Sequence, residues 1–75
     1  MKTDSRTSNI LIKINGENKT VPLNTSILKL LESLKINKDR VVIEMNKKIL
    51  KKEVFDSTML SENDHLEVVT FVGGG

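Results

Sequence analysis

The C-terminal end of the chain presents a group that could take part in chemistry. Three glycines, Gly73 to Gly75, directly follow a β-branched run that ends at Val72. Glycine has no Cβ and gains little by packing, so a free segment of this kind is expected to fray. The same lack of side chains would let it enter a narrow channel and place the carboxylate of Gly75 inside another protein. A disordered end without a role is the alternative, but no polar linker separates the glycines from the run before them.

The remaining residue types argue against several other kinds of site. The chain has 75 residues, no cysteine, one histidine and two phenylalanines as its only aromatic residues. Without cysteine there is no disulfide framework, thiol nucleophile or cysteine-based metal site. The net charge is +2 at pH 7, with lysine and glutamate intermixed, so no basic stripe with stacking aromatics indicates nucleic-acid binding. We expect no metal site and no cofactor bound by this chain.

No catalytic residue is assigned. The histidine, His65, stands at the start of the last predicted strand without a visible partner and is interpreted as a surface residue. Asp64 and Glu67 could mimic a pair of catalytic carboxylates, but a turn residue and a solvated strand residue are the better interpretation. The pairs Lys47-Lys48 and Lys51-Lys52 could contact an acidic partner or nucleic acid, although such pairs more often solvate a surface.

Length and composition predict one small domain with short extensions. Residues 1–8 are polar and are expected to be a flexible leader, 9–72 the folded domain, and 73–75 a flexible tail. No apolar run approaches the roughly 18 residues that a membrane span needs. The segment from Met1 to Asn9 lacks the apolar region of a signal peptide, so the cytoplasm is the expected location and no membrane partner is expected.

The first half of the domain reads as a hairpin followed by a helix. Ile10, Ile12 and Ile14 alternate with other residues in a strand over 9–15. Asn15-Gly16 is a strong two-residue turn signal, because both positions tolerate positive φ. A short second strand over 19–22 follows, and Pro22 should lie at its end or at a sheet edge because it donates no hydrogen bond.

A change of period marks the helix. Four apolar residues fall on one helical face, and Ser26, or Thr25 before it, is the natural N-cap. The expected helix is about three turns long and depends on packing against the hairpin. The four apolar residues are Ile27, Leu30, Leu31 and Leu34.

The second half returns to strands. Strands are expected over 41–46, 48–50 and 65–71, with the last beside the first strand of the chain. The intervening segment 51–61 is irregular and should cover the core with Val54, Phe55, Met59 and Leu60. Asn63 is available for a left-handed turn conformation. The order β-β-α-β-β-β predicts an α+β fold of the ubiquitin-like β-grasp class, a mixed four- to five-stranded sheet with one main helix packed across it.

With the tail and the elements in view, the chain resembles the ubiquitin-like sulfur carriers of the ThiS/MoaD family, and the ThiS type in particular. The resemblance covers nearly all of the chain from Ile10 onward. Asn63 departs from it, because the family usually has glycine before the aspartate; asparagine tolerates positive φ well. The shared motifs are Asn15-Gly16-Glu17, Ser26-Ile27-x-x-Leu30-Leu31-x-x-Leu34, Met45-Asn46 and Asp64-x-x-Glu67-Val68-Val69-x-x-Val72-Gly73-Gly74-Gly75.

The resemblance implies a carrier and not an enzyme. A ThiF-type adenylating enzyme, related to ubiquitin-activating enzymes, would use ATP and Mg²⁺ to adenylate the Gly75 carboxylate. A sulfur donor such as a cysteine desulfurase would then leave a thiocarboxylate on Gly75. A ThiG-type thiazole synthase would take that sulfur into the thiazole ring of thiamine. Gly73, Gly74 and Gly75 would be the segment that enters the partner's site.

Three other functions stay open. The small subunit of molybdopterin synthase has the same fold, tail and thiocarboxylate, but usually a longer chain between helix and tail. A related carrier could serve tRNA thiolation or another sulfur pathway. A plain β-grasp binding module, on RNA or within a larger enzyme, is the alternative from a different class.

The alternation of side chains places a candidate partner surface. If Leu66 and Val68 point to the core, then Glu67, Val69 and Phe71 point to solvent. The same argument turns Val41, Ile43 and Met45 inward and Val42 outward. The free chain is expected to be a monomer; the alternatives are that Phe71 covers the sheet edge or that the patch serves self-association. The predicted partner-binding patch is Val42, Val69, Phe71 and Val72.

Overall fold

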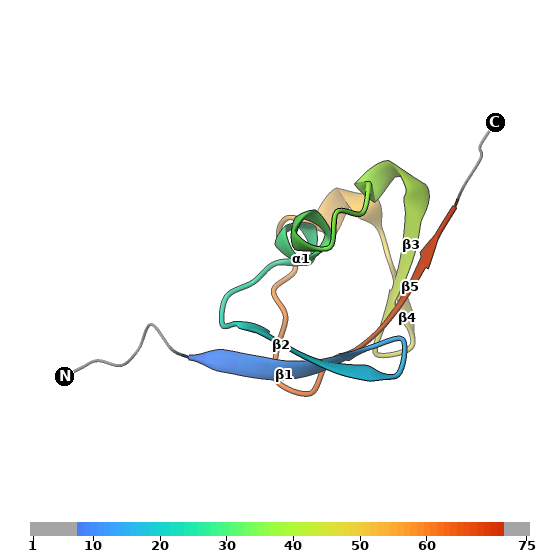
Figure 1. Cartoon of the computed structure of the whole chain (residues 1–75). Coiled ribbons are helices and arrows are strands. Elements are labelled where there is room, and N and C mark those ends of the chain that lie inside the picture. Colours follow the sequence, from blue (N-terminus) through green and yellow to red (C-terminus); the bar gives the residue numbers. More distant parts are fainter. Residues whose placement is uncertain (1–7, 72–75) are drawn as a thin grey trace.

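Five strands form one mixed sheet, and a single α-helix packs against its concave face (Figure 1). The computed structural model describes residues 8–71, so the predictions for 1–7, Val72 and the glycines 73–75 lie outside the described residues. The elements are β1 (Asn9–Ile14), β2 (Glu17–Pro22), α1 (Ile27–Ser33), β3 (Val41–Met45), β4 (Lys48–Leu50) and β5 (His65–Thr70).

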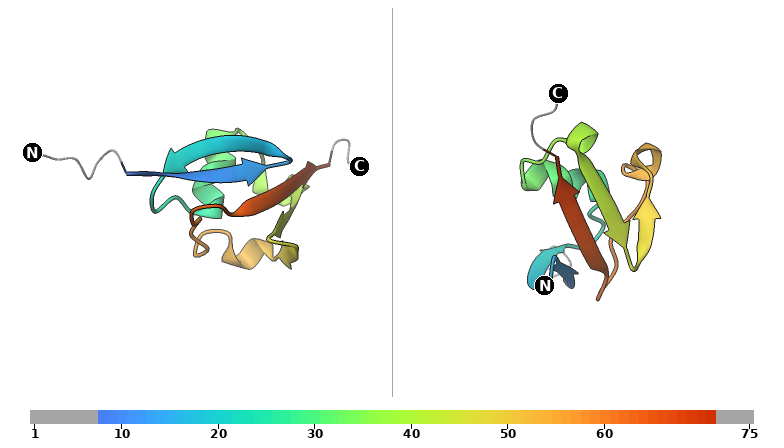
Figure 2. Two further views of the ribbon diagram at one scale, coloured as in Figure 1. Left: turned by 90° about the horizontal axis from the view of Figure 1, so that it is seen from below. Right: turned by 90° about the vertical axis from the view of Figure 1, so that its right-hand side faces the viewer.

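The last strand occupies the middle of the sheet. The strand order is β2-β1-β5-β3-β4, with β5 parallel to β1 and antiparallel to β3. Figure 2 shows β5, in red, between the blue hairpin and the green strand β3. The predicted β-grasp arrangement is therefore confirmed, and so is the position of the last strand beside the first.

Two tight turns of the same kind build the two hairpins. Asn15 and Gly16 have φ values of 50° and 86°, and Asn46 and Lys47 have φ values of 51° and 73°. Two consecutive positive φ values match the turn that suits the twist of a two-residue hairpin. Because such a turn lets pairing resume at once, β2 begins at Glu17, opposite Ile14, and not at Lys19 as predicted.

The sheet edge and the left-handed turn residue agree with the sequence. Pro22 is the last residue of β2, and β2 lies at one edge of the sheet. Its missing N–H therefore removes no hydrogen bond from the sheet interior. Asn63 adopts the left-handed conformation predicted for it, with a φ of 69°.

The core lies between α1 and the concave face of the sheet. Ile27, Leu30 and Leu31 of α1 are buried, as the helical period predicts. From the irregular segment, Phe55 and Leu60 are buried, whereas Val54 and Met59 are exposed. The prediction that all four cover the core is wrong for the last two, because neighbouring side chains point in different directions in the 3₁₀ turn Lys52–Val54 and in the bridge between Met59 and Ser26.

Helix α1 begins as predicted but is shorter. The Ser26 side chain accepts a hydrogen bond from the backbone N–H of Lys29 at 3.1 Å, which confirms the N-cap. The helix has seven residues, about two turns and not three. Lys35 takes a φ of 61°, its N–H donates to Glu32 O, and the N–H of Ile36 donates to Leu31 O. These two hydrogen bonds are typical of a helix C-terminus. Sequence analysis did not predict this end, because lysine occupies the position that glycine usually takes.

The conformation of Lys35 generates a stability prediction. Lys35→Gly should raise the free energy of unfolding by about 0.5–1 kcal/mol, because glycine takes a left-handed conformation without the steric cost of a Cβ. Lys29→Gly, at an exposed position inside α1, should lower it by roughly 1 kcal/mol. Urea unfolding of both variants measures the two effects. A lower stability of Lys35→Gly would contradict this account of how the helix ends.

Candidate functional site

Strand β5 leads the chain to the predicted carboxylate site. Its pairing with β3 continues past Thr70, because the backbone N–H of Phe71 donates to Arg40 O at 2.8 Å. Phe71 is the last described residue. This hydrogen bond holds its backbone beside Arg40, the residue that directly precedes β3. Gly75 follows four positions later in the sequence (75 − 71 = 4). The described structure therefore fixes the position of Phe71, the residue that precedes 72–75 in the sequence.

Three of the four residues in the predicted partner patch lie together on the convex face of the sheet. Val42 and Val69 are direct cross-strand partners, and Phe71 follows Val69 by two positions, just past the end of β5. Their exposed fractions are 37%, 56% and 51%, respectively. Their neighbours Ile43 and Val68 are buried on the opposite face. We call Val42, Val69 and Phe71 the docking face; Val72, the fourth predicted member, lies outside the described residues.

Two glutamates and an isoleucine lie next to the docking face on the same sheet. Glu44 and Glu67 are direct partners in the next row of the β3–β5 pair, and Ile49 of β4 lies opposite Glu44. Like charges directly opposite one another are unfavourable. Within the described residues, neither carboxylate takes part in a salt bridge. Sequence reasoning missed Ile49 and Arg40 because only the strand register shows which residues border the patch.

The side chain of Asn15 holds β5 on one edge. Its Nδ2 donates to Val68 O at 3.1 Å, and its Oδ1 accepts from the Val68 N–H at 2.8 Å. The backbone N–H of Asn15 donates to Leu66 O at 2.9 Å. The sequence indicated only the turn at Asn15, because the partner atoms lie 53 residues away.

Asn46 holds the start of β5 on the opposite edge. Its N–H donates to His65 O at 2.8 Å, and its Oδ1 accepts from the His65 N–H at 2.9 Å. Its Nδ2 donates to Asp64 Oδ1 at 3.0 Å, and Asp64 Oδ2 accepts from the Ser61 N–H at 2.7 Å. Asp64 is therefore a buried turn residue, while His65 and Glu67 are exposed. The structure supports the interpretation of these residues as structural or solvated and not as a catalytic set.

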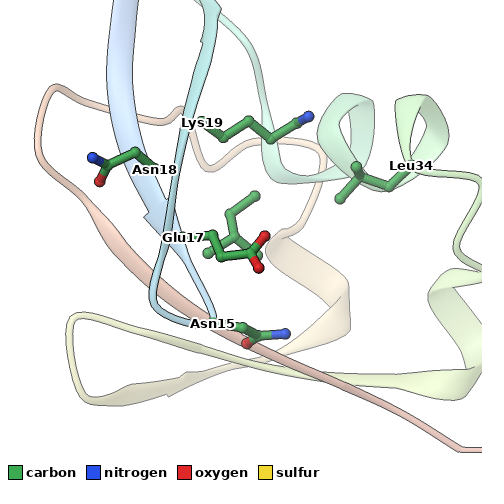
Figure 3. A pocket seen from close by; sticks show the side chains of 6 residues that line it. Asn15, Glu17, Asn18, Lys19 and Leu34 are labelled. Atoms are coloured by element: carbon green, nitrogen blue, oxygen red, sulfur yellow. The ribbon is translucent and has the colours of Figure 1, made fainter.

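A shallow hollow lies between the β1–β2 hairpin and the end of α1 (Figure 3). Glu17 and Lys19 point into it opposite Leu34, whereas Asn18 points away. It holds no nucleophile with an adjacent base. Within residues 8–71, no group of three or more His, Cys, Asp or Glu side chains could hold a metal ion. The hollow therefore has the lining of a surface depression and not that of a reaction centre.

A surface ion pair connects the 3₁₀ turn Lys38–Arg40, which precedes β3, with the 3₁₀ turn Lys52–Val54, which follows β4. Lys52 Nζ lies 2.8 Å from Asp39 Oδ1. The hydrogen bond from Lys52 lowers the pKa of Asp39 below its ordinary value, with further lowering by the nearby charges of Lys38 and Lys52. The same bond raises the pKa of Lys52. Both groups are solvent-exposed, so the pair contributes little to stability.

None of the helices within residues 8–71 has the length and apolar character needed to cross a membrane. The described part of the chain thus combines a β-grasp sheet, a central strand that ends beside an exposed apolar face, and a sequence that continues into three glycines. These features define a protein of the ubiquitin-like β-grasp class.

Comparison with known families identifies the group more closely. The model of the ThiS family matches residues 12–75, which includes the three terminal glycines. The chain belongs to the ThiS family. A crystal structure of ThiS from Geobacter metallireducens superposes with a TM-score of 0.74 and is 32% identical, and the match covers 88% of this chain and 100% of that one.

Relatives of known sequence extend the comparison. An uncharacterized protein, ycf40, of Pyropia yezoensis is 46% identical over 68 residues, which cover 91% of this chain and 96% of that protein. The sulfur carrier protein ThiS of Bacillus subtilis is 33% identical over 66 residues, covering 87% and 100%. A thiazole synthase of Magnetococcus marinus is 34% identical over 64 residues, which cover 85% of this chain but 20% of that enzyme.

The two phenylalanines should differ sharply in their contribution to stability. Phe55 is 2% exposed and Phe71 is 51% exposed. Phe71→Asp should change the free energy of unfolding by no more than about 0.5 kcal/mol, because a solvent-facing side chain loses little water on folding. Phe55→Ala should cost about 3–5 kcal/mol, because it leaves a cavity in the core. Thermal unfolding by circular dichroism compares them, and a comparable loss in both variants would show that Phe71 also supports the core.

Proposed function

We propose that this chain is a sulfur carrier for thiazole formation in thiamine biosynthesis. It acts as a protein co-substrate and not as a catalyst. The observation that carries the proposal is the family match, which covers residues 12–75 and so includes Gly75. The position of the chain's exit from the sheet, beside an exposed apolar face, supports the same function.

The chemistry requires activation of the Gly75 carboxylate. A carboxylate is a poor electrophile, so a ThiF-type enzyme first joins it to AMP from ATP, with pyrophosphate leaving. A sulfur nucleophile from a persulfide donor, such as one charged by a cysteine desulfurase, then attacks the acyl carbon and displaces AMP. Reductive cleavage of the resulting acyl disulfide by a thiol leaves the thiocarboxylate on Gly75. ATP and Mg²⁺ belong to the activating enzyme in this scheme.

The sulfur acceptor in this proposal is a ThiG-type thiazole synthase. A segment similar to this chain lies within the thiazole synthase of Magnetococcus marinus, where it makes up about a fifth of that enzyme. A carrier-like segment and a thiazole synthase in one polypeptide are expected where the two act together. This relative favours thiamine over molybdopterin or tRNA thiolation as the destination of the sulfur.

We assign the docking face to the adenylating enzyme. Val42, Val69 and Phe71 are contiguous across β3 and β5, and they adjoin the point where residues 72–75 begin. A partner that receives the Gly75 carboxylate must lie close to that point. Exposed aliphatic and aromatic side chains grouped in this way usually mark a binding surface.

The first functional prediction concerns the terminal carboxylate. Incubated with a ThiF-type enzyme, ATP, Mg²⁺ and a sulfur donor, the chain should gain the mass of one oxygen exchanged for sulfur. Intact-mass spectrometry measures the exchange, and fragmentation locates it at Gly75. Deletion of Gly75 should abolish the exchange and leave the circular dichroism spectrum unchanged. A competent enzyme that never produces the mass change would refute the carrier function.

A second functional prediction tests the docking face. Phe71→Asp should weaken binding to the ThiF-type enzyme by about 2 kcal/mol or more, because a charge replaces an aromatic anchor at the interface. Leu23→Asp is the matched control, since Leu23 is 50% exposed and directly follows the edge strand β2, which β1 separates from β5. Isothermal titration calorimetry compares both variants with the native chain. Equal binding by all three proteins would place the docking surface elsewhere.

A further inference from the structure

The backbone pairing between β1 and β5 is short. The register contains only Lys13 opposite His65 and Ile14 opposite Leu66. The ladder on this edge of β5 nevertheless continues, because the N–H of Lys13 donates to Asp64 O and that of Asn15 donates to Leu66 O, both at 2.9 Å. The next group on β5 in this series is Val68. At that point β1 has already turned away at Gly16, so no β1 backbone can pair with Val68.

The Asn15 amide takes the place of the missing backbone. Its Oδ1 accepts from the Val68 N–H and its Nδ2 donates to Val68 O, at 2.8 Å and 3.1 Å. One side chain thus supplies both an acceptor and a donor, as a strand residue would. Figure 3 shows the Asn15 side chain on the hairpin turn, where the ribbon of β5 passes it.

The conformation of Asn15 places its amide there. Its φ of 50° belongs to the left-handed region, which the hairpin turn requires. Asn24 is also left-handed, with a φ of 70°, but its side chain makes no hydrogen bond among the described residues. The contact at Asn15 is therefore a feature of its place beside β5 and not a general consequence of a left-handed asparagine.

We propose that Asn15 is a positioning residue for transfer at Gly75. This inference rests on the proposed function. The Asn15 amide fixes Val68, and the chain then passes through Val69 and Thr70 to Phe71, where the described structure ends. Without the amide, β5 would keep its β3 partner but lose its last hydrogen bonds on the β1 side. The direction in which the C-terminal segment leaves would then vary, and fewer encounters would place the carboxylate correctly.

The decisive variant is Asn15→Gly, with Asn24→Gly as the matched control. Glycine keeps the left-handed turn at either position and removes the side chain. In the free chain, hydrogen exchange at the Val68 amide should accelerate by roughly tenfold or more in Asn15→Gly, because its acceptor is gone. The Lys13 amide, which donates to Asp64 O in the same ladder, should keep its native protection. Asn24→Gly should leave both amides unchanged.

Steady-state adenylation by the ThiF-type enzyme then separates positioning from docking. Asn15→Gly should lower kcat by roughly tenfold or more with little change in KM, since small misplacements of a reacting group are costly. Asn15→Asp keeps the acceptor for Val68 N–H and loses the donor, so its kcat should lie between those of the native chain and Asn15→Gly. If Asn15→Gly does not fold, Asn15→Asp is used in its place. A lower kcat in Asn15→Asp, with the Lys13 amide as protected from hydrogen exchange as in the native chain, would then support the inference.

Three results would overturn the inference: an unchanged kcat in folded Asn15→Gly, a change in KM alone, or equal acceleration of exchange at Val68 and Lys13. The last would show a global loss of stability in place of a local release. Failure of the native chain to be adenylated at all would instead refute the proposed function. The two failures are therefore distinguishable in one set of measurements.

Discussion

The rest of the structure depends on the hydrogen bonding of β5 along both of its edges. A central strand has no solvent-facing edge, so each of its backbone groups needs a partner in the protein. The β3 side supplies backbone partners from Leu66 to Thr70. The β1 side supplies only a short backbone register, and side chains extend the ladder at both ends. Glu62 accepts from the Leu11 N–H at 3.0 Å at one end, and Asn15 bonds Val68 at the other.

The two faces of β5 separate stability from recognition. Leu66 and Val68 are buried against the core below α1, while Val69 and Phe71 alternate with them toward solvent. A substitution on the outer face therefore changes the surface offered to a partner without opening a cavity. This alternation allows one strand to be the centre of the sheet and also to carry an exposed apolar surface.

The motifs shared with the ThiS family have physical roles in this structure. Asn15-Gly16 forms the hairpin turn, and the Asn15 side chain completes the pairing of β5. Asn46, after Met45, forms the second turn and bonds both His65 and Asp64. Each of these two motifs thus acts on β5. The family match continues beyond the described residues and includes the three terminal glycines.

The sequence by itself determined the element order, the β-grasp class, the inward and outward faces of β3 and β5, and the turn at Asn15. These are local properties, because alternation, helical period and preference for positive φ act over a few residues. Burial in the irregular segment could not be predicted in the same way. Val54 and Met59 are apolar like Phe55, but no regular period shows which of these side chains face the core. The early end of α1 could not be predicted from the sequence either, because lysine does not normally indicate a left-handed residue at the end of a helix.

Only the tertiary structure decided the contacts between distant segments. The amide of Asn15 meets Val68 across 53 residues, and Asn46 meets His65 across 19. The border of the docking face, with Ile49 and the pair Glu44 and Glu67, follows from strand register. Register is set jointly by burial and by hydrogen bonding over the whole sheet, so a sequence read segment by segment cannot fix it. The sequence thus predicted the elements, and the fold decided which distant residues hold β5 in place.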